Sequence, residues 1–285
     1  MDTTPPLRAA PRTVPGSLAL RVLLGGVGAA ISWSLLAFGG LIAGMFVSNS
    51  SLLTSWRFDG TLAGTHGEVV AVEPTSSRVN GVAVLRVRFE FEAPDGPRQS
   101  SSYGTTFAGR VADVVEVEWP EGHADLARIV GMRTRAFSGW VGLTLLVPFA
   151  GLVGLLISLR ANTRRLRLMR YGSSAWGVLT DKTRTNTQIN GCYVYRLTFE
   201  FLDETGTRRT ATDRTHHAEF FDRDVARQVL YDVATGHSCL VGLSPGKPAI
   251  ADGAWVPAGG RGVVKVLLLP TVAATVLATA PMVQL

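Results

Sequence analysis

Residues 80–96 read NGVAVLRVRFEFEAPDG, and residues 190–206 read NGCYVYRLTFEFLDETG. Both stretches open with Asn-Gly, then alternate apolar and polar side chains, and end at a second turn that contains glycine. Asn and Gly tolerate positive φ and therefore favour a tight hairpin turn. A period of two places one set of side chains on a single buried face. Each stretch therefore predicts an antiparallel β-strand with one apolar face.

The two stretches belong to a longer internal repeat. Residues 67–98 align with residues 177–208 at a shift of 110 positions, without a gap, and eleven of the 32 pairs are identical. About two identities are expected by chance for unrelated segments of ordinary composition. The identical pairs are Gly67/Gly177, Thr75/Thr185, Asn80/Asn190, Gly81/Gly191, Val84/Val194, Arg86/Arg196, Phe89/Phe199, Glu90/Glu200, Phe91/Phe201, Gly96/Gly206 and Arg98/Arg208.

The repeat predicts two copies of one small antiparallel β domain, sandwich-like or barrel-like, with about five or six strands each. A later strand is expected to end each copy, at 114–119 and at 225–231. Segments 107–111 and 218–223 are expected to form short helices between the strands. The linker 160–171 is expected to continue the preceding apolar run as a helix.

Three apolar runs flank the copies, at 22–47, 137–159 and 266–285. The first has no charged residue and, as one helix, would reach about 39 Å, more than the roughly 30 Å hydrocarbon core. It is too long for a signal peptide, whose apolar region has about 7–15 residues. The third run is the weakest, because it contains Pro270 and Pro281. We predict a membrane protein of the α+β class with three transmembrane helices and two duplicated β domains.

The distribution of Arg and Lys predicts the orientation, since these residues gather on the cytoplasmic side of a membrane. Residues 49–138 carry a net charge of −2, residues 160–265 carry +6 and the first 48 residues carry +2. Together they give the net charge of +6 of the whole chain. The predicted order is a cytoplasmic tail (1–19), a span (20–48), an extracytoplasmic β domain (49–136), a span (137–159), a cytoplasmic linker helix and β domain (160–262) and a span (263–285). The N-terminus is then cytoplasmic and the C-terminus extracytoplasmic. The basic pI of about 9.8 is explained by this topology and is no sign of nucleic-acid binding.

Several of these residues resemble the pattern of a bacterial membrane-anchored family called domain of unknown function 3592. They are Gly177, Tyr193, Tyr195, Phe199, Thr205-Gly206 and Val229-Leu-Tyr-Asp232 in the second copy, and Gly67, Leu85, Phe89, Asp95-Gly96 and Val115-Glu-Val-Glu-Trp-Pro120 in the first. The first copy departs from the pattern at Leu85 and Trp119, which replace tyrosines, and the second has Val233 in place of a proline. The resemblance implies membrane location and this architecture, and it implies no catalytic residues.

The densest group of metal-ligand side chains is His216, His217 and Asp222. Adjacent histidines on a strand point to opposite faces, and on a helix they diverge by about 100°, so they rarely share one metal. Cys192 is a second candidate, because a nucleophilic cysteine needs a base such as His216 or His237 nearby. The first copy has Val82 at the position of Cys192, which favours a packing role. We therefore expect no catalytic residue, metal or cofactor.

Two further features concern the membrane. The basic linker with Arg160, Arg164, Arg165, Arg167 and Arg170 is expected to meet anionic lipid headgroups. Gly40 and Gly44 form a GxxxG spacing that allows helices to pack closely. Gly25-Gly26-Val-Gly28 lies in an apolar run and lacks the lysine of a phosphate loop. No predicted span has an acidic residue at its centre, which argues against a transporter.

These features predict a non-enzymatic bacterial inner-membrane protein. Its β domains would bind another membrane or envelope protein, or a second copy of the chain, while the basic linker contacts lipids. A second interpretation is a membrane-tethered enzyme or metal-binding sensor that uses the second β domain. A third is an accessory subunit of a transport system.

Overall fold

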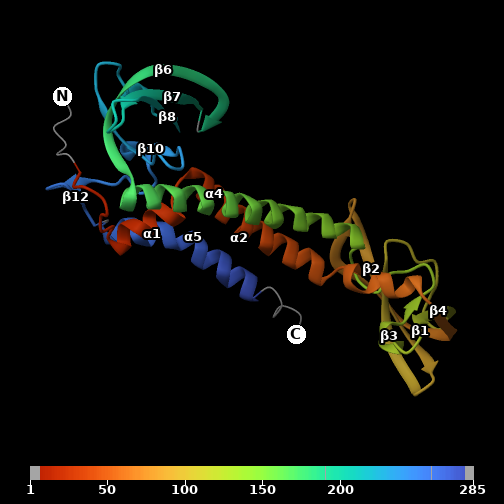
Figure 1. The fold of residues 1–285 in the computed structure, drawn as a ribbon. Coiled ribbons are helices and arrows are strands. Elements are labelled where there is room, and N and C mark those ends of the chain that lie inside the picture. The colour runs from red at the N-terminus through yellow and green to blue at the C-terminus, as the bar shows by residue number, and fades with distance from the viewer. Residues whose placement is uncertain (1–6, 190, 258, 280–285) are drawn as a thin grey trace. The chain divides into compact units, whose positions relative to one another are not determined.

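The computed structural model describes residues 7–189, 191–257 and 259–279. It is an α+β structure with two five-stranded antiparallel sheets, and its described residues form four helices longer than one turn (Figure 1). The helices are α1 (Gly16–Leu24), α2 (Val27–Ser48), the single turn α3 (Leu52–Ser55), α4 (Leu146–Tyr171) and α5 (Gly260–Thr279). The 3-10 turns are η1 (Trp56–Asp59), η2 (Ala124–Leu126), η3 (Gly139–Leu145), η4 (Ala218–Phe220) and η5 (Val241–Leu243).

The two sheets have the same strand order, and both are antiparallel and five-stranded, as the repeat predicted. The first runs β3-β2-β1-β4-β5 and the second β8-β7-β6-β9-β10. The strands are β1 (Leu62–Val79), β2 (Val82–Ala93), β3 (Gly96–Gly104), β4 (Val114–Pro120), β5 (Arg128–Ile129), β6 (Ser173–Ile189), β7 (Cys192–Leu202), β8 (Arg208–Thr215), β9 (Arg227–Tyr231) and β10 (Ser238–Leu240). A separate small hairpin joins β11 (Ile250–Ala251) to β12 (Ala254–Trp255).

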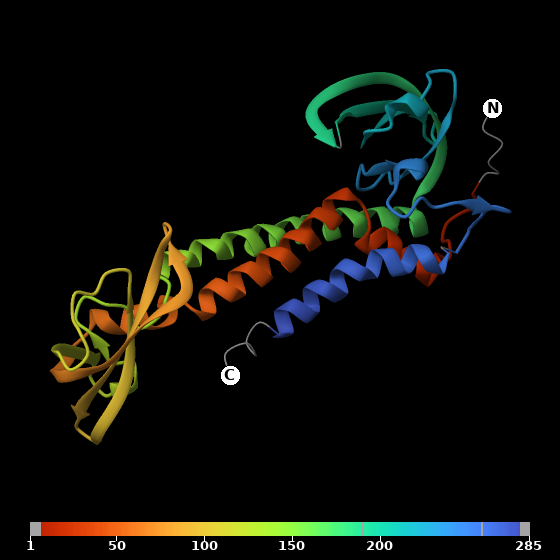
Figure 2. The same cartoon turned by 180° about the vertical axis from the view of Figure 1, so that it is seen from behind.

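The long hairpin of each sheet carries the same irregularities at the same repeat positions. Pairing of β1 with β2 shifts register between Val69 and Ala71, and pairing of β6 with β7 shifts between Leu179 and Asp181, each 110 residues later. A second shift lies between Pro74 and Arg78 in the first hairpin and between Arg184 and Gln188 in the second. The hairpins therefore bend at equivalent places, because a bulge turns the strand that contains it. Figure 2 shows the long twisted β1–β2 hairpin.

The identical pair Thr75/Thr185 has the same contact in both sheets. The Thr75 hydroxyl donates to the Val84 carbonyl at 2.8 Å, and the Thr185 hydroxyl donates to the Val194 carbonyl at 2.7 Å. Each threonine lies within the second register shift, where the regular ladder of backbone hydrogen bonds is interrupted. The threonine thus adds a hydrogen bond to a strand carbonyl at the place where the ladder is irregular.

The cores of the two sheets are also equivalent. Phe89 and Phe199 are fully buried, and each lies on the face that the alternating pattern predicted. An aromatic pair closes each core, with ring centroids 5.2 Å apart for Phe91 and Trp119 and 5.0 Å apart for Phe201 and Tyr231. Trp119 therefore makes in the first sheet the ring contact that Tyr231 makes in the second.

Each sheet curls until its edge strands approach each other. In the first sheet the Ser100 hydroxyl donates to the Ala127 carbonyl at 2.9 Å, and the Ile129 amide donates to the Ser102 hydroxyl at 2.7 Å. The second bond joins β3 to β5, the two ends of the strand order, and the first joins β3 to the residue just before β5. In the second sheet β8 and β10 approach in the same way. Such closure protects backbone groups that an open edge would expose.

The chain divides into two compact units. One contains the chain up to Leu36 together with Ala150–Ala274, and includes the second sheet. Its core joins α1, α4 and the sheet through buried residues such as Leu18, Val22, Met169 and Leu230. The other contains Ala37–Phe149 and includes the first sheet.

The prediction that residues 22–47 form one helix is wrong. The helix is interrupted at Gly25 and Gly26, which separate α1 from α2, and Gly26 has a φ of +93°. The buried Asn162 side-chain amide of α4 donates to the Leu23 and Gly25 carbonyls at 3.0 and 3.1 Å. Carbonyls that the end of α1 leaves free are thus satisfied from another helix. The 22 residues of α2 rise about 33 Å, close to the hydrocarbon thickness.

Helices α2 and α4 run side by side in both views (Figures 1 and 2). Glycines make the contact close: a Cβ at Gly151 would lie 2.8 Å from the Leu36 amide nitrogen, and one at Gly39 would lie 2.8 Å from the Val147 side chain. Large apolar side chains point away from the contact and are exposed, among them Phe38, Met45, Phe149 and Ile157. Of the three predicted spans, two are found among the described residues: Val27–Ser48 and Gly139–Tyr171 are long and apolar enough to cross a membrane by length and composition, and α5 is not.

Three other expectations need correction or completion. Segment 107–111 has no helix, and segment 218–223 has only the turn η4. The second apolar run starts with the 3-10 turn η3 rather than with regular α-helix. The third run forms most of α5, which contains Pro270; its last residues, 280–285, and the repeat residue Asn190 lie outside the described residues.

Candidate functional site

A cleft of about 1530 Å³ lies in the unit that contains the second sheet. Strands β6, β7 and β8 form one wall. The rest is formed by residues of segments 216–221 and 242–248, by Arg165 of α4, by Gly26, and by Val27 at the start of α2. The curved β6–β7 hairpin is drawn in Figure 1. The cleft therefore lies beside the point where α1 ends and α2 begins.

Arg165 and the buried Asp213 form a partly buried ion pair at the wall of the cleft. The Arg165 Nη2 atom donates to Asp213 Oδ1 at 2.9 Å, and Arg165 Nη1 donates to the Leu243 carbonyl at 3.4 Å. Burial raises the pKa of Asp213, although the positive charge of Arg165 opposes this shift. The pair ties α4 to the β8 edge of the sheet. Arg165 is therefore directed into the protein.

The remaining arginines of the linker, Arg160, Arg164, Arg167 and Arg170, are exposed along α4. They leave a basic helix surface next to the apolar part of α4. Their expected contact with lipid headgroups stays a prediction. For Arg165, the bond to Asp213 means that a lipid would have to compete with a buried carboxylate.

Arg196 of β7 lies directly opposite Arg214 of β8, and both line the cleft. Side chains at opposite positions of an antiparallel pair have Cβ atoms about 4.5–5.5 Å apart. Both arginines are exposed, and among the described residues neither guanidinium has a carboxylate within 4.0 Å. Lys247 adds a third cation to the lining. Our reading of the sequence missed this pair, which the hairpin register could have identified.

His216 and His217 also line the cleft, and the expectation that adjacent histidines diverge is wrong. The chain leaves β8 at Thr215 and turns, so the two rings lie 3.9 Å apart between centroids. His217 Nδ1 is 3.4 Å from Glu219 Oε1, while Asp222 is exposed outside the cleft lining. Among the described residues no group of three or more His, Cys, Asp or Glu side chains could hold a metal ion.

The two cysteines lie in different surroundings. Cys192 is exposed at the start of β7 and is not among the described residues that line the cleft with His216. Cys239 is buried in the core, and burial raises the pKa of its thiol to about 11. A thiol with a raised pKa is a poor nucleophile at neutral pH. Cys239 therefore packs as a small apolar side chain.

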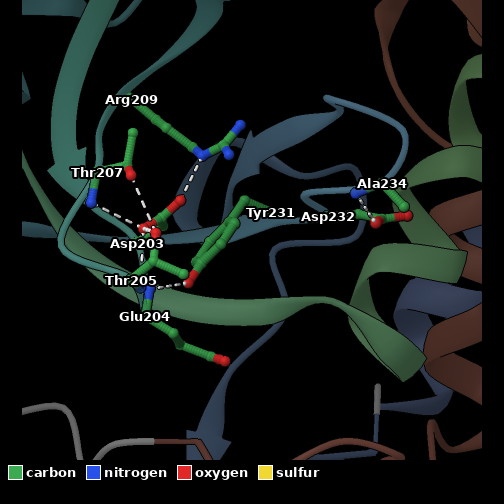
Figure 3. Close-up of polar contacts among 8 residues, drawn as sticks. All are labelled: Asp203, Glu204, Thr205, Thr207, Arg209, Tyr231, Asp232 and Ala234. Carbon is green, nitrogen blue, oxygen red and sulfur yellow. Dashed lines mark hydrogen bonds and ion pairs between the residues drawn. The ribbon is translucent and has the colours of Figure 1, made fainter.

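A polar cluster holds the turn between β7 and β8 (Figure 3). The Asp203 carboxylate accepts hydrogen bonds from the Thr205 and Thr207 amides at 2.9 Å and from Arg209 Nε at 2.6 Å. The Thr205 hydroxyl and Arg209 together lower the pKa of Asp203 well below its usual range. The Tyr231 hydroxyl accepts from the Glu204 amide at 3.0 Å. The carboxylate is saturated by its own turn, so this cluster is structural.

Of the predicted helix-packing glycines, Gly40 is buried and Gly44 is half-buried in α2. The described contacts with α4 use neighbouring small residues instead. A Cβ at Gly154 would lie 2.6 Å from the Ser32 hydroxyl, and one at Gly28 would lie 3.1 Å from the Ser158 hydroxyl. A role for Gly40 and Gly44 in packing against a further helix stays a prediction.

No family model and no curated protein matches the chain. The resemblance to domain of unknown function 3592 therefore stays a prediction that rests on the turn glycines and core aromatic residues.

Proposed function

We propose that the chain is a non-enzymatic bacterial inner-membrane protein that crosses the bilayer with α2, α4 and α5. The main support is the surface of the paired helices α2 and α4. Glycine and serine lie in their mutual contact, while Phe38, Met45 and Ile157 are more than half exposed on the outside. Apolar surface of this kind normally requires an apolar cover, and a bilayer supplies one for two adjacent long helices.

In this proposal the two sheets face opposite compartments. Helix α4 is the connection between β5 and β6, so a single crossing by α4 separates the sheets. The exposed arginines at the end of α4 favour the cytoplasm for the second sheet. The first sheet is then extracytoplasmic, and the net charge of −2 on residues 49–138 contrasts with +6 on residues 160–265.

The sheets act as binding modules for a partner, which we propose to be another membrane or envelope protein or a second copy of the chain. Two features support binding over catalysis: the buried thiol of Cys239 and the turn-saturated carboxylate of Asp203. Each of these reactive groups already has a structural role. A transport accessory role would be a special case of the same partner binding.

Reporter fusions test the topology. Alkaline phosphatase fused after residue 100 should be active, and a fluorescent protein fused after residue 252 should fluoresce. A phosphatase fusion that is active only after residue 252 would show that the orientation is the reverse of the proposed one. Phosphatase fusions that are inactive at both positions would show that α4 does not cross the membrane.

Crosslinking in native membranes followed by co-purification tests the binding role. A recurrent partner or a crosslinked dimer is expected. Stoichiometric zinc in the purified full chain would favour the metal-binding sensor instead, because it requires ligands that the proposal does not use.

A further inference from the structure

We propose that the cleft of the second sheet binds a phosphate-type anion between Arg196 and Arg214. The two arginines occupy opposite positions on β7 and β8 and line the same cleft. Like charges at opposite positions of an antiparallel pair repel each other. Such a pair is stabilised when an anion lies between the guanidinium groups and accepts hydrogen bonds from both.

The charge of the whole lining agrees with an anionic ligand. Arg165 and Asp213 neutralise each other, which leaves Arg196, Arg214 and Lys247 as cations and Asp181 as the carboxylate of the lining. The Thr183 hydroxyl is a hydrogen-bond partner of Asp181, so that carboxylate is held at β6. The excess of cations lies at β7, β8 and the loop that contains Lys247.

A phosphate group fits this arrangement better than a single carboxylate. Arginine forms paired hydrogen bonds with phosphate oxygens, and a tetrahedral phosphate can accept from two arginines and a lysine at once. Neighbouring lining residues offer further hydrogen-bond donors, the hydroxyls of Thr198 and Thr212. The ligand class is therefore a phosphate monoester or diester.

The first sheet lacks this pair although it keeps one of the arginines. Arg86 is the repeat equivalent of Arg196, and Tyr103 lies opposite it on β3. The Arg86 Nε atom donates to the Ser101 hydroxyl at 3.2 Å. The first sheet thus satisfies its arginine internally, so the paired arginines are a special feature of the second sheet.

Two sources could supply the phosphate, a phospholipid headgroup of the adjacent leaflet or a soluble phosphate compound. The start of α2 lines the cleft, so a headgroup would be within reach if α2 crosses the bilayer. This lipid source rests on the proposed membrane topology, whereas the anion site itself does not. Reporter fusions test the topology separately, so either proposal can fail while the other stands.

The test uses the full chain in a nonionic detergent. Native mass spectrometry measures binding of dioctanoyl phosphatidylglycerol, with dioctanoylglycerol as the matched lipid without phosphate. Inorganic phosphate is added as a competitor, and its effect on the melting temperature is measured in parallel. Arg196→Gln and Arg214→Gln are the test variants, and Arg86→Gln is the control in the equivalent strand.

Each Gln variant should weaken binding about tenfold or more, since a hydrogen bond to a charged group is worth about 1.5–3 kcal/mol. Arg86→Gln should bind like the wild type. If inorganic phosphate does not displace the bound lipid, the phospholipid headgroup is the source of the phosphate group. If inorganic phosphate displaces the lipid and raises the melting temperature of the chain, a soluble phosphate compound is the source. Equal binding by wild type and both test variants, or equal binding of dioctanoylglycerol, would overturn the proposal.

Folding of the variants provides a second check. Without an anion, Arg196→Gln and Arg214→Gln remove repulsion and should melt no lower than the wild type. A marked fall in melting temperature in phosphate-free buffer would mean that the pair stabilises the sheet by itself, which contradicts an anion site.

Discussion

The first sheet places Tyr103 opposite Arg86, whereas the second sheet places Arg214 opposite Arg196. The turns after β2 and β7 differ as well. Asp95 and Arg98 form an exposed ion pair in the first, while Asp203 is buried and bonded to Arg209 in the second. Strand order, register shifts and core rings are nevertheless shared. The duplicated part of the molecule is therefore the scaffold, and the edges and turns have diverged.

The largest expected effect tests whether the two equivalent cores unfold independently of each other. Phe89→Ala and Phe199→Ala each remove a fully buried ring and should cost about 3–5 kcal/mol. Hydrogen exchange on the full chain should rise in β1–β5 for the first variant and in β6–β10 for the second. Faster exchange in both sheets from either variant would show that the two units unfold together.

The next effect concerns a contact that only the second sheet makes. Arg165→Ala leaves the carboxylate of Asp213 buried without its ion pair and should cost about 3 kcal/mol near neutral pH. The neighbouring exposed Arg164 supplies the control variant Arg164→Ala, which should cost little.

The loss in Arg165→Ala should depend on pH. Burial already raises the pKa of Asp213, and the variant removes the cation that opposes this shift. A raised pKa in the folded state means that stability falls as pH rises above the ordinary Asp value. The loss should therefore be larger at about pH 8 than at about pH 4.5 in thermal melts. A loss independent of pH would assign the effect to packing of the Arg165 stem.

A smaller effect tests the equivalence of the bends. Thr75→Val and Thr185→Val each remove a hydroxyl that donates to a strand carbonyl and should cost about 1 kcal/mol. Thr→Ser at either position keeps the hydroxyl and serves as the control. Unequal losses, measured by local hydrogen exchange, would show that the two register shifts have different energetic roles.

The last effect is a change with pH and concerns the turn of the second sheet. Asp203→Asn keeps an oxygen acceptor but removes the charge paired with Arg209. Because the pKa of Asp203 is lowered in the folded state, its stabilising contribution is present above the ordinary Asp pKa and declines as pH falls below it. The difference in melting temperature between wild type and variant should shrink over that acidic range. A constant difference would contradict the charge effect.

Much of the sheet architecture followed from local patterns in the sequence. Alternation around Phe89 and Phe199 predicted the buried faces, since a strand has a fixed period of two. Asn80 and Gly81 have the positive φ values that their hairpin turn requires. Helix 160–171 was also predicted correctly as a continuation of the apolar run.

The site was less predictable, because its contacts join distant segments. Arg165 belongs to a run of similar arginines, and only the position of Asp213, 48 residues away, distinguishes it from the others. His216 and His217 were expected to diverge because both regular strand and regular helix geometry separate neighbouring side chains, whereas the chain turns after Thr215. Such outcomes depend on where strands end, which is the least certain part of a pattern-based prediction.

The sequence by itself determined the repeat, the alternating strands and the apolar runs, because each depends on neighbours within a few positions. Tertiary structure decided where the first apolar run breaks, since the carbonyls at Leu23 and Gly25 need the Asn162 amide. It also decided that Arg196 lies opposite Arg214, since the pairing of β7 with β8 brings these two distant positions together. Local patterns specify elements, and the hydrogen-bonding and charge requirements of distant groups specify how those elements end and meet.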